Sequence, residues 1–335
     1  MDTLFPIASG QPTDLAGDFG LSTSKFLTII TPTFNRVEWL PRLYKSLKSQ
    51  SVRDFEWLIV DDGSSDETPD FCSAVIQEAA IAVRVIRKAN GGKHTALNAG
   101  IAAVVTELIF IVDSDDYLTP NAVSRIQEVW SRYKGEGRSG ISFMRGTSEE
   151  EPLGHRFPRD NEVSSYIEMR FNRGIKGDKA EIYRSDVLKR FRFPEFKGEK
   201  FLAEDAVWAP IGLQYQMVHI NEIIYVGNYL EAGLTAGGKS FMLRCPNGAI
   251  ESVKWFLSRK VRMRVRAPMA WRYLAYGLFA KRPLIEHICS SELPLFVTSQ
   301  IPGGLALYVY WRHKFRNEIA NASGQQVRTP KAANK

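Results

Sequence analysis

The sequence predicts an α/β fold with a mostly parallel sheet and flanking helices, and two observations lead to this prediction. Apolar, β-branched runs alternate with segments whose apolar residues have helical spacing, which is the pattern of βαβ units. A polar cluster directly follows each of four such runs. Because ligands of open α/β sheets bind beyond the carboxyl ends of the strands, we expect the four clusters to converge on one site.

The expected elements follow one another from Phe26. Strands are predicted at 26–34, 55–60, 83–87 and 108–112, and helices at 37–49, from about 68, and at 90–104. Thr119 is the expected N-cap of the next helix, with Pro120 at its first position. Beyond Gly140, strands are expected at 141–146 and 217–230, and a helix near 204–208.

Length and composition bound the class of protein. A chain of 335 residues with 44% hydrophobic and 24% charged residues accommodates one large α/β domain with an appendage, or two domains. Its three cysteines are far apart and odd in number, so we expect no disulfide framework and a reducing compartment. Residues 1–24 lack the basic segment of a signal peptide and are expected to be a flexible leader, and residues 319–335 a disordered tail.

Three aspartates, Asp113, Asp115 and Asp116, directly follow the apolar run at 108–112. Two carboxylates about 4 Å apart repel by roughly 1 kcal/mol in water and by several times more near a protein surface. The cluster must therefore be hydrated or bind cations. If the chain stays extended, Asp113 and Asp115 face one side, which suits Mg²⁺ or Mn²⁺ carrying a substrate phosphate. A solvated turn in which Asp116 caps backbone groups is the alternative.

Spacing excludes three other ligand-binding motifs. An EF-hand loop that starts at Asp113 needs glycine and glutamate where this chain has Leu118 and Ser124. A Walker loop needs Ser or Thr after its lysine, whereas His94 follows Lys93. The chain contains no G-x-G-x-x-G sequence, so a dinucleotide-binding fold of the usual kind is unsupported.

The other polar clusters have two interpretations each. Asp61 could accept a hydrogen bond from a base or a ribose hydroxyl, and Asn90 and Lys93, beside two glycines, could approach a phosphate or base. An acidic turn that caps a helix is the alternative for the first of these loops, and a solvated lysine is the alternative for the second. The pair Glu204–Asp205 could supply a general base, or it could be the acidic first turn of a helix.

Taken in order, five motifs resemble those of the family 2 glycosyltransferases, which have the GT-A fold. The motifs are TPTFNR (31–36), DDGSSDET (61–68), NGGKHTALNAGI (90–101), DSDDYL (113–118) and EDAVW (204–208). Their order and spacing are more specific than any one of them. The resemblance implies a GT-A catalytic domain at 25–235, with a nucleotide-sugar half at about 25–118 and an acceptor half at about 119–235. A basic helical region at 236–318 would follow.

The resemblance also implies a role for each candidate residue. Asp205 would be the catalytic base, and Asp113 and Asp115 would bind Mn²⁺ or Mg²⁺. Glu204 and Trp208 would contact or support the acceptor. The nucleotide would be bound by Thr31, Pro32, Arg36, Asp61, Asp62, Asn90, Lys93 and Asp113.

The activity implied by the resemblance is inverting, metal-dependent transfer of a hexose from a nucleotide-sugar, expected to be a UDP-sugar. The acceptor would be a hydroxyl of a glycan or lipid-linked molecule in bacterial cell-surface polysaccharide synthesis. Two alternatives stay open. A nucleotidyltransferase acting on a sugar phosphate would also use paired carboxylates and metal, and a nucleotide-sugar-binding protein would lack catalysis.

The segment 252–285 contains nine basic residues and no acidic one: Lys254, Arg259, Lys260, Arg262, Arg264, Arg266, Arg272, Lys281 and Arg282. Aromatic residues are interleaved with them, a pattern typical of nucleic-acid binding or of a membrane-surface helix. A solvated helical cap on the catalytic domain is the third interpretation. We favour peripheral contact with the cytoplasmic face of the cell membrane, with no nucleic acid as partner.

Two further segments bear on this prediction. Residues 293–311 are mostly apolar, but Pro302, Gly303 and Gly304 interrupt them. We therefore expect an interfacial or packed segment in place of a membrane span. The glycine-rich segment 229–241 would suit a lid that closes over the donor.

Overall fold

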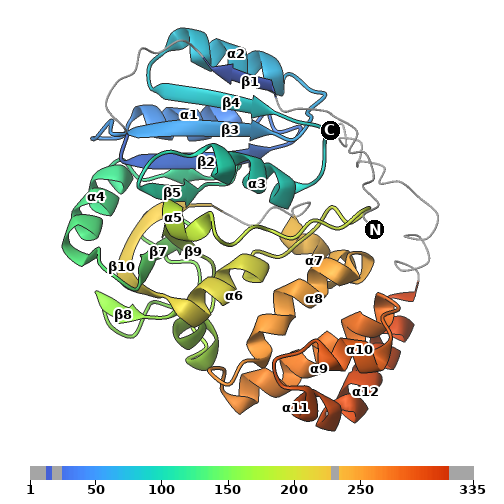
Figure 1. Cartoon of the computed structure of the whole chain (residues 1–335). Helices are drawn as coiled ribbons and strands as arrows, with labels where there is room; N and C mark the ends of the chain where they lie inside the picture. Colours follow the sequence, from blue (N-terminus) through green and yellow to red (C-terminus); the bar gives the residue numbers. More distant parts are fainter. Residues whose placement is uncertain (1–12, 17–24, 228–233, 317–335) are drawn as a thin grey trace, which may run out of the picture. The chain divides into compact units, whose positions relative to one another are not determined.

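The computed structural model describes residues 13–16, 25–227 and 234–316. Two compact units make up the chain. The first unit comprises residues 1–193 and 207–228, and the second comprises residues 194–206 and 229–335. In Figure 1, the described part of the first unit is a sheet with helices, and that of the second unit is helical.

A ten-stranded sheet organises the first unit, in the order β1-β4-β3-β2-β5-β9-β7-β10-β6, with β8 beside β10. Strands β4, β3, β2, β5, β7 and β10 run in one direction, and β1, β9, β6 and β8 run against them. The strands are β1 (Thr13–Ala16), β2 (Leu27–Thr33), β3 (Phe55–Asp61), β4 (Ala82–Arg87), β5 (Leu108–Ile111), β6 (Tyr117–Leu118), β7 (Arg138–Gly146), β8 (Glu162–Ser164), β9 (Lys179–Arg184) and β10 (Gln216–Val226).

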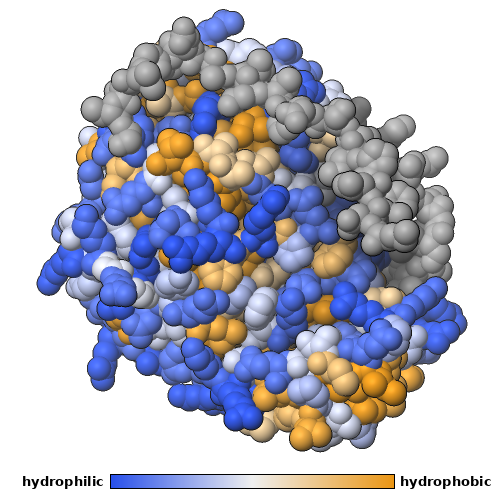
Figure 2. Space-filling view, viewed as in Figure 1, coloured by the Kyte–Doolittle hydropathy of each residue, from blue (hydrophilic) through white to orange (hydrophobic). Residues whose placement is uncertain are grey.

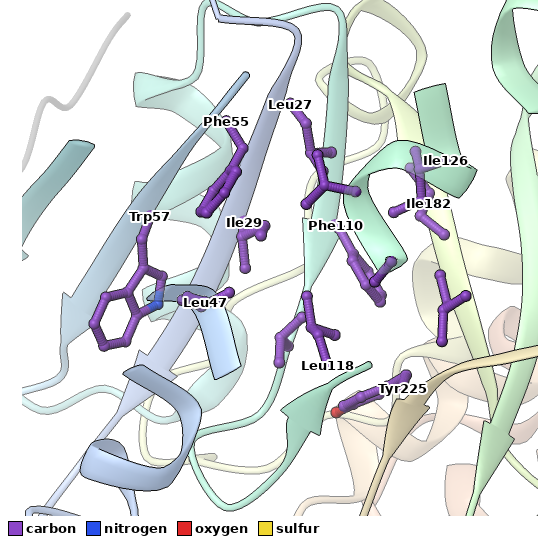
Figure 3. Packing of buried hydrophobic residues seen from close by; sticks show 14 of the residues in the cluster. Leu27, Ile29, Leu47, Phe55, Trp57, Phe110, Leu118, Ile126, Ile182 and Tyr225 are labelled. Atoms are coloured by element: carbon purple, nitrogen blue, oxygen red, sulfur yellow. The ribbon is translucent and has the colours of Figure 1, made fainter. Parts of the chain in front are cut away.

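Helices cover both faces of this sheet. They are α1 (Leu40–Lys48), α2 (Thr68–Glu78), α3 (Lys93–Ala103), α4 (Ala122–Tyr133), the π-helix Ile167–Asn172, α5 (Ser185–Leu188) and α6 (Asp205–Gln214). Apolar residues of α1, α2 and α4 share one buried cluster with alternate residues of the sheet. Figure 3 shows Leu47 of α1 and Ile126 of α4 facing strand residues such as Ile29 and Phe110. These three helices therefore pack on the same face.

Helix α3 packs on the opposite face of the sheet. A Cβ atom at Gly100 would lie 3.0 Å from the side chains of Ile30 and Val60. These two residues alternate along β2 and β3 with the residues that face α1. The glycine lets α3 approach the strands closely, which fixes the start of that helix beside the strand ends.

The predicted fold class is confirmed: the sheet is mixed but mostly parallel, with flanking helices and a helical C-terminal region. The antiparallel strand β9 was not predicted, because its sequence KAEIYR mixes charged and apolar residues without clean alternation. Four residues of the expected leader, Thr13–Ala16, form β1 and pair with Arg84–Arg87. Such a pairing depends on a distant partner and cannot be inferred from four residues.

The predicted start of α4 was wrong. The helix begins at Ala122 after Asn121, and Thr119 is not its N-cap. The Thr119 amide donates to the Ile224 carbonyl at 3.0 Å, which ties this residue to the sheet edge. The side chain of Gln50 supplies the missing acceptor, because its Oε1 accepts the Val123 amide at 3.1 Å. Gln50, which is distant in sequence, therefore accepts the hydrogen bond that an N-cap side chain would otherwise accept.

The described part of the second unit is built from helices. They are α7 (Leu234–Arg244), α8 (Pro246–Lys254), the 3₁₀ helix Trp255–Leu257, α9 (Met263–Phe279), α10 (Leu284–Cys289), α11 (Pro294–Ser299) and α12 (Ile301–Lys314). Their core contains Tyr273, Leu274 and Trp311. The apolar stretch 293–311 is divided between α11 and α12. No helix in the described part of the chain is long and apolar enough to cross a membrane.

Replacement of His219 by glutamine should reduce the decrease in the free energy of unfolding that occurs as the pH falls. His219 is buried on β10, with its Nε2 3.3 Å from the Ser164 carbonyl. Burial lowers the pKa of His219 to about 4 from 6.5. As pH falls below 6.5 the unfolded chain therefore takes up the proton first. The full stability is present above this pH, and up to about 3 kcal/mol is lost by pH 4.

Urea unfolding at several pH values measures this effect. The exposed His313 provides the matched control, and His313→Gln should keep the pH dependence of the wild type. An unchanged slope between pH 6.5 and 4 in His219→Gln would contradict the assignment.

Candidate functional site

Four polar loops lie at one edge of the sheet. Strands β4, β3, β2 and β5 are neighbours and all run parallel. Their carboxyl ends are Arg87, Asp61, Thr33 and Ile111, so the loops that follow them leave the sheet side by side. The predicted convergence of these loops is confirmed.

The loop after β2 is fastened to the loop after β3. Asn35, which has a left-handed backbone (φ 52°), accepts the Ser65 amide on its Oδ1 at 2.7 Å. Its own amide donates to the Ser64 hydroxyl at 2.9 Å. Asp66 accepts the Val37 amide at 3.2 Å and the Thr68 amide, at the start of α2, at 3.1 Å. The two loops thus form one rigid surface.

The side chains of β2 and its loop occupy different surroundings. The Thr31 hydroxyl accepts the Trp57 indole N–H at 2.9 Å inside the core, so it faces away from the strand ends. Pro32 is buried opposite Val60 in the sheet. Arg36 is half-buried and close enough to Asp113 to favour its ionised form. Of these three candidates, only Arg36 directs charge toward the aspartate cluster.

Asp61 and Asp62 are both buried at the end of β3. Asp61 accepts the Ser64 amide at 2.8 Å and lies 3.3 Å from the Arg87 Nε. The two oxygens of Asp62 accept the Gly92 amide at 2.7 Å, the Gly91 amide at 3.0 Å and the Lys88 ammonium at 2.7 Å. Asp62 therefore anchors the third loop.

The third loop also depends on a glycine of the second. Gly63 has φ 81°, in the left-handed region, and a Cβ there would lie 3.0 Å from the Asn90 amide nitrogen. The Asn90 side-chain amide donates to Asp62 at 3.2 Å. Asn90 and Lys93 are thus held at fixed positions at the start of α3.

Asp62→Ala should lower the free energy of unfolding by about 3 kcal/mol, because it leaves the Gly91 and Gly92 amides without their acceptor and removes the carboxylate partner of the Lys88 ammonium. Chemical denaturation measures the loss. Asp70→Ala, at an exposed position in the first turn of α2, is the control and should cost less than about 1 kcal/mol. Equal losses in the two variants would contradict the anchoring role of Asp62.

The fourth loop carries the aspartate cluster in a turn, closed by the Asp116 amide donating to the Asp113 carbonyl at 3.2 Å. The chain does not stay extended there, but exposure still alternates: Asp113 and Asp115 are half-buried, and Ser114 and Asp116 are buried. The Lys93 ammonium lies 2.7 Å from the Asp113 carboxylate. Burial opposes ionisation of Asp113, but Lys93, with Arg145 and Arg36, outweighs it and lowers the pKa of this carboxyl.

Asp116 belongs to a buried polar cluster behind the turn. Arg145 of β7 lies 3.0 Å from its carboxylate, and the Tyr225 hydroxyl of β10 donates to it at 2.5 Å. The same hydroxyl accepts the Asp113 amide at 3.1 Å. Burial and then the charge of Asp113 raise the pKa of Asp116, against the opposing guanidinium. A Cβ at Gly227 would overlap the Asp116 carboxylate, at 1.6 Å.

Asp205 and Glu204 lie at the start of α6, and both are half-buried. Asp205 is the first residue of the helix and belongs to the second unit, whereas α6 continues in the first unit from Val207. Trp208, one turn further, is buried and stacks on Tyr183 with ring centroids 4.5 Å apart. This stacking anchors the first turns of α6 to β9 within the first unit.

The residues of the fourth loop fit a hard divalent cation. Asp113 and Asp115 offer carboxylate oxygens from the less buried side of the turn, which are the ligands that Mg²⁺ and Mn²⁺ prefer. Within residues 13–16, 25–227 and 234–316, no group of three His, Cys, Asp or Glu side chains could hold a metal. Two carboxylates suffice only when substrate phosphates complete the coordination, which is usual for Mg²⁺.

Sequence reasoning missed Lys88, Arg145 and Tyr225. Lys88 directly follows β4, so its place at the ligand edge of the sheet could have identified it. Arg145 and Tyr225 come from strands whose neighbours in the sheet were not predicted. For these two the sequence offers no comparable signal.

Residues 28–191 match the model of the family described as Glycosyl transferase family 2. An uncharacterized glycosyltransferase from Nostoc is 35% identical over 31% of this chain and 32% of its own. An undecaprenyl-phosphate 4-deoxy-4-formamido-L-arabinose transferase from Serratia proteamaculans is 29% identical over 31% of this chain and 33% of its own. The chain thus aligns with about a third of the length of these curated relatives.

Solved structures show the same fold at low sequence identity. Staphylococcus aureus TarS 1–349 in complex with UDP-GlcNAc has a TM-score of 0.52 and 17% identity, over 90% of this chain and 93% of its own. A mannosyltransferase from Pyrobaculum calidifontis in complex with GDP-Man and Mn²⁺ has a TM-score of 0.51 and 15% identity, over 90% of this chain and 85% of its own.

Proposed function

We propose, on the premise that residues 28–191 of this chain belong to glycosyl transferase family 2, that the protein transfers a sugar from a nucleotide-sugar to an acceptor hydroxyl. The observation that carries this proposal is the aspartate turn held beside Lys93 at the edge where four loops converge. Such a site offers both carboxylates for a cation and fixed positive charge for a diphosphate.

The donor is a UDP-sugar in this proposal, in keeping with the UDP-GlcNAc complex of the similar TarS structure. Asp61 and the backbone around Pro32 would line the base site, with Asn90 nearby. Asp62 would act by holding the loop of Asn90 and Lys93, because its oxygens already bind that loop. Thr31 would contribute through its backbone, since its hydroxyl is bonded to Trp57.

Asp115, together with Asp113, would hold Mn²⁺ or Mg²⁺. The bound cation would supply Lewis-acid stabilisation of the departing diphosphate. Lys93 lies against Asp113 and would move from this ion pair toward a phosphate oxygen when the donor binds. The hydrogen bonds within and between the loops hold the backbone of the site in place, so little further reorganisation would accompany the reaction once the donor is bound.

Asp205 would act as the general base. Its carboxylate would take the proton of the acceptor hydroxyl as the oxygen attacks the anomeric carbon from the side opposite the diphosphate. The proton goes to the carboxylate, the bond to the diphosphate breaks, and the anomeric configuration is inverted. Glu204 would contact or position the acceptor beside it.

Product analysis separates this proposal from a nucleotidyltransferase. The glycosyltransferase forms UDP and a glycosylated acceptor from a UDP-sugar, whereas the alternative forms pyrophosphate from a nucleoside triphosphate and a sugar phosphate. We expect the protein to release UDP from a UDP-sugar in the presence of Mn²⁺, and to release no pyrophosphate from a nucleoside triphosphate and a sugar phosphate. Pyrophosphate release alone would contradict the proposal, and nucleotide-sugar binding without turnover across a panel of donors and acceptors would favour a non-catalytic role.

The acceptor in this proposal is a glycan or a lipid-linked molecule of cell-surface polysaccharide synthesis. The Serratia relative is named for transfer to undecaprenyl phosphate, which supports an acceptor of the lipid-linked kind. Peripheral contact of the basic segment 252–285 with the cytoplasmic face of the membrane would bring such an acceptor within reach. The lid prediction for 229–241 falls partly outside the described residues.

A further inference from the structure

Helix α12 leaves one apolar face uncovered. The exposed residues of this face recur at helical spacing on one side of the helix: Pro302, Leu305, Ala306, Val309 and Tyr310. Val309 is 63% exposed, Tyr310 54% and Leu305 44%. The other side packs on α9, where Gly304 lies against Leu274 and Trp311 against Tyr276. The helix is therefore anchored in the second unit with a second apolar face turned to solvent.

Neighbouring elements extend this face. Leu295 of α11 is 89% exposed, and Trp271 of α9 is 38% exposed. Trp271 donates its indole N–H to Gln300 at 2.9 Å, so it lies beside the first turn of α12. Figure 2 shows hydrophobic side chains gathered over the region that Figure 1 labels α11 and α12. We call Trp271, Leu295, Leu305, Val309 and Tyr310 the apolar patch.

Basic residues accompany the apolar patch. Between Ser252 and Arg316 the sequence has two acidic residues, Glu286 and Glu292, against twelve basic ones. The basic residues are the nine named for 252–285 together with Arg312, Lys314 and Arg316. Arg312 and Lys314 are exposed in the last turn of α12, directly after the apolar patch. The same unit thus combines uncovered apolar residues with a large excess of positive charge.

The combination of exposed apolar residues and positive charge favours one binding partner for the apolar patch over three others. A second copy of the chain would bring two strongly basic units together, which like-charge repulsion opposes. Residues 317–335, NEIANASGQQVRTPKAANK, have few large apolar side chains with which to cover the patch. A nucleic acid would match the charge but gains little from exposed Leu and Val. An anionic lipid surface matches both features, since apolar residues enter the interface while Lys and Arg meet the headgroups.

We propose that α12 and α11 are the membrane-docking surface of this protein, with an anionic lipid bilayer as the partner. The contact is made by the apolar patch, and the basic residues of α9 and α12 add attraction to the headgroups. This assignment adds α11 and α12 to the contact proposed for the segment 252–285, in which Trp271 and the basic residues of α9 lie. It does not depend on the proposed transferase activity.

Vesicle flotation tests the proposal on the full chain, with phosphatidylcholine vesicles with and without phosphatidylglycerol. We expect the wild type to float with the anionic vesicles and to bind neutral ones much more weakly. Val309→Glu should lower the apparent partition coefficient by at least about tenfold, because an apolar side chain that would enter the lipid interface is replaced by a charged one. Val105→Glu is the matched control, because Val105 is 80% exposed in the first unit and should bind like the wild type.

Each other outcome overturns the proposal. Wild-type binding by Val309→Glu, with an unchanged melting temperature, would show that α12 does not enter the interface. Equal binding to neutral and anionic vesicles would remove the role of the basic residues. A wild type that fails to float but forms a dimer broken by Val309→Glu, as measured by sedimentation, would identify a second copy as the occupant. UDP binding by Val309→Glu should equal that of the wild type, so this result stays separate from the transferase proposal.

Discussion

Asp205→Asn should lower the turnover of sugar transfer by about 10² to 10⁴-fold, the usual contribution of a general base. The substitution keeps the size of the side chain and removes its ability to take the acceptor proton. The affinity for the donor should be unchanged, because Asp205 does not lie in any of the four loops that would hold the nucleotide. Steady-state rates and UDP affinity, measured on the same preparations, separate the two effects.

Glu204→Gln is the matched control for Asp205→Asn, because it neutralises the adjacent carboxylate at the start of α6. It should alter the apparent acceptor affinity more than turnover. A raised pH should not restore the rate of Asp205→Asn, since the amide cannot accept the proton at any pH. Full turnover in Asp205→Asn would exclude this residue as the base.

Arg145→Met should be the most destabilising single substitution near the site, at about 3 to 5 kcal/mol, because it leaves the Asp116 carboxylate buried without its cation. The side chain of Asp116 is 1% exposed and that of Arg145 is 10% exposed. Denaturant unfolding measures this loss. Arg138→Met, at the partly exposed start of the same strand, is the control and should cost about 1 kcal/mol or less.

A second substitution tests the cause of this loss. In Arg145→Met with Asp116→Asn, no unpaired carboxylate is left in the interior, so part of the lost stability should return. Additive losses in the double variant would show that Arg145 stabilises by packing on Tyr225, whose ring centroid is 5.0 Å from the guanidinium carbon, and not through its charge.

The strand–loop pattern was sufficient to predict the parallel part of the fold and the edge that carries the site. Each of β2, β3, β4 and β5 is an apolar run followed by a polar loop, and this local pattern determines both the strand and the place of its loop. The antiparallel strands were harder, because β9 and β1 depend on partners distant in sequence.

The same distinction holds for the site. The spacing of Asp113 and Asp115 predicted that they share one side of the fourth loop, and both are half-buried there, although the chain forms a turn in place of the expected extended segment. The burial of Asp116 with Arg145 and Tyr225 could not be predicted from the sequence. It depends on the strand order β5-β9-β7-β10, which the sequence pattern does not reveal. The role of Asp62 as an anchor was also hidden, since two adjacent aspartates look alike until their hydrogen bonds are known.

The most direct test of the central claim is UDP binding measured by calorimetry, with and without Mn²⁺, on the wild type and Asp115→Ala. We expect Mn²⁺ to strengthen UDP binding to the wild type, and we expect Asp115→Ala to lose this strengthening while keeping its melting temperature. Binding of UDP that is independent of Mn²⁺, or unchanged in Asp115→Ala, would contradict the assignment of the aspartate turn as the cation and diphosphate site.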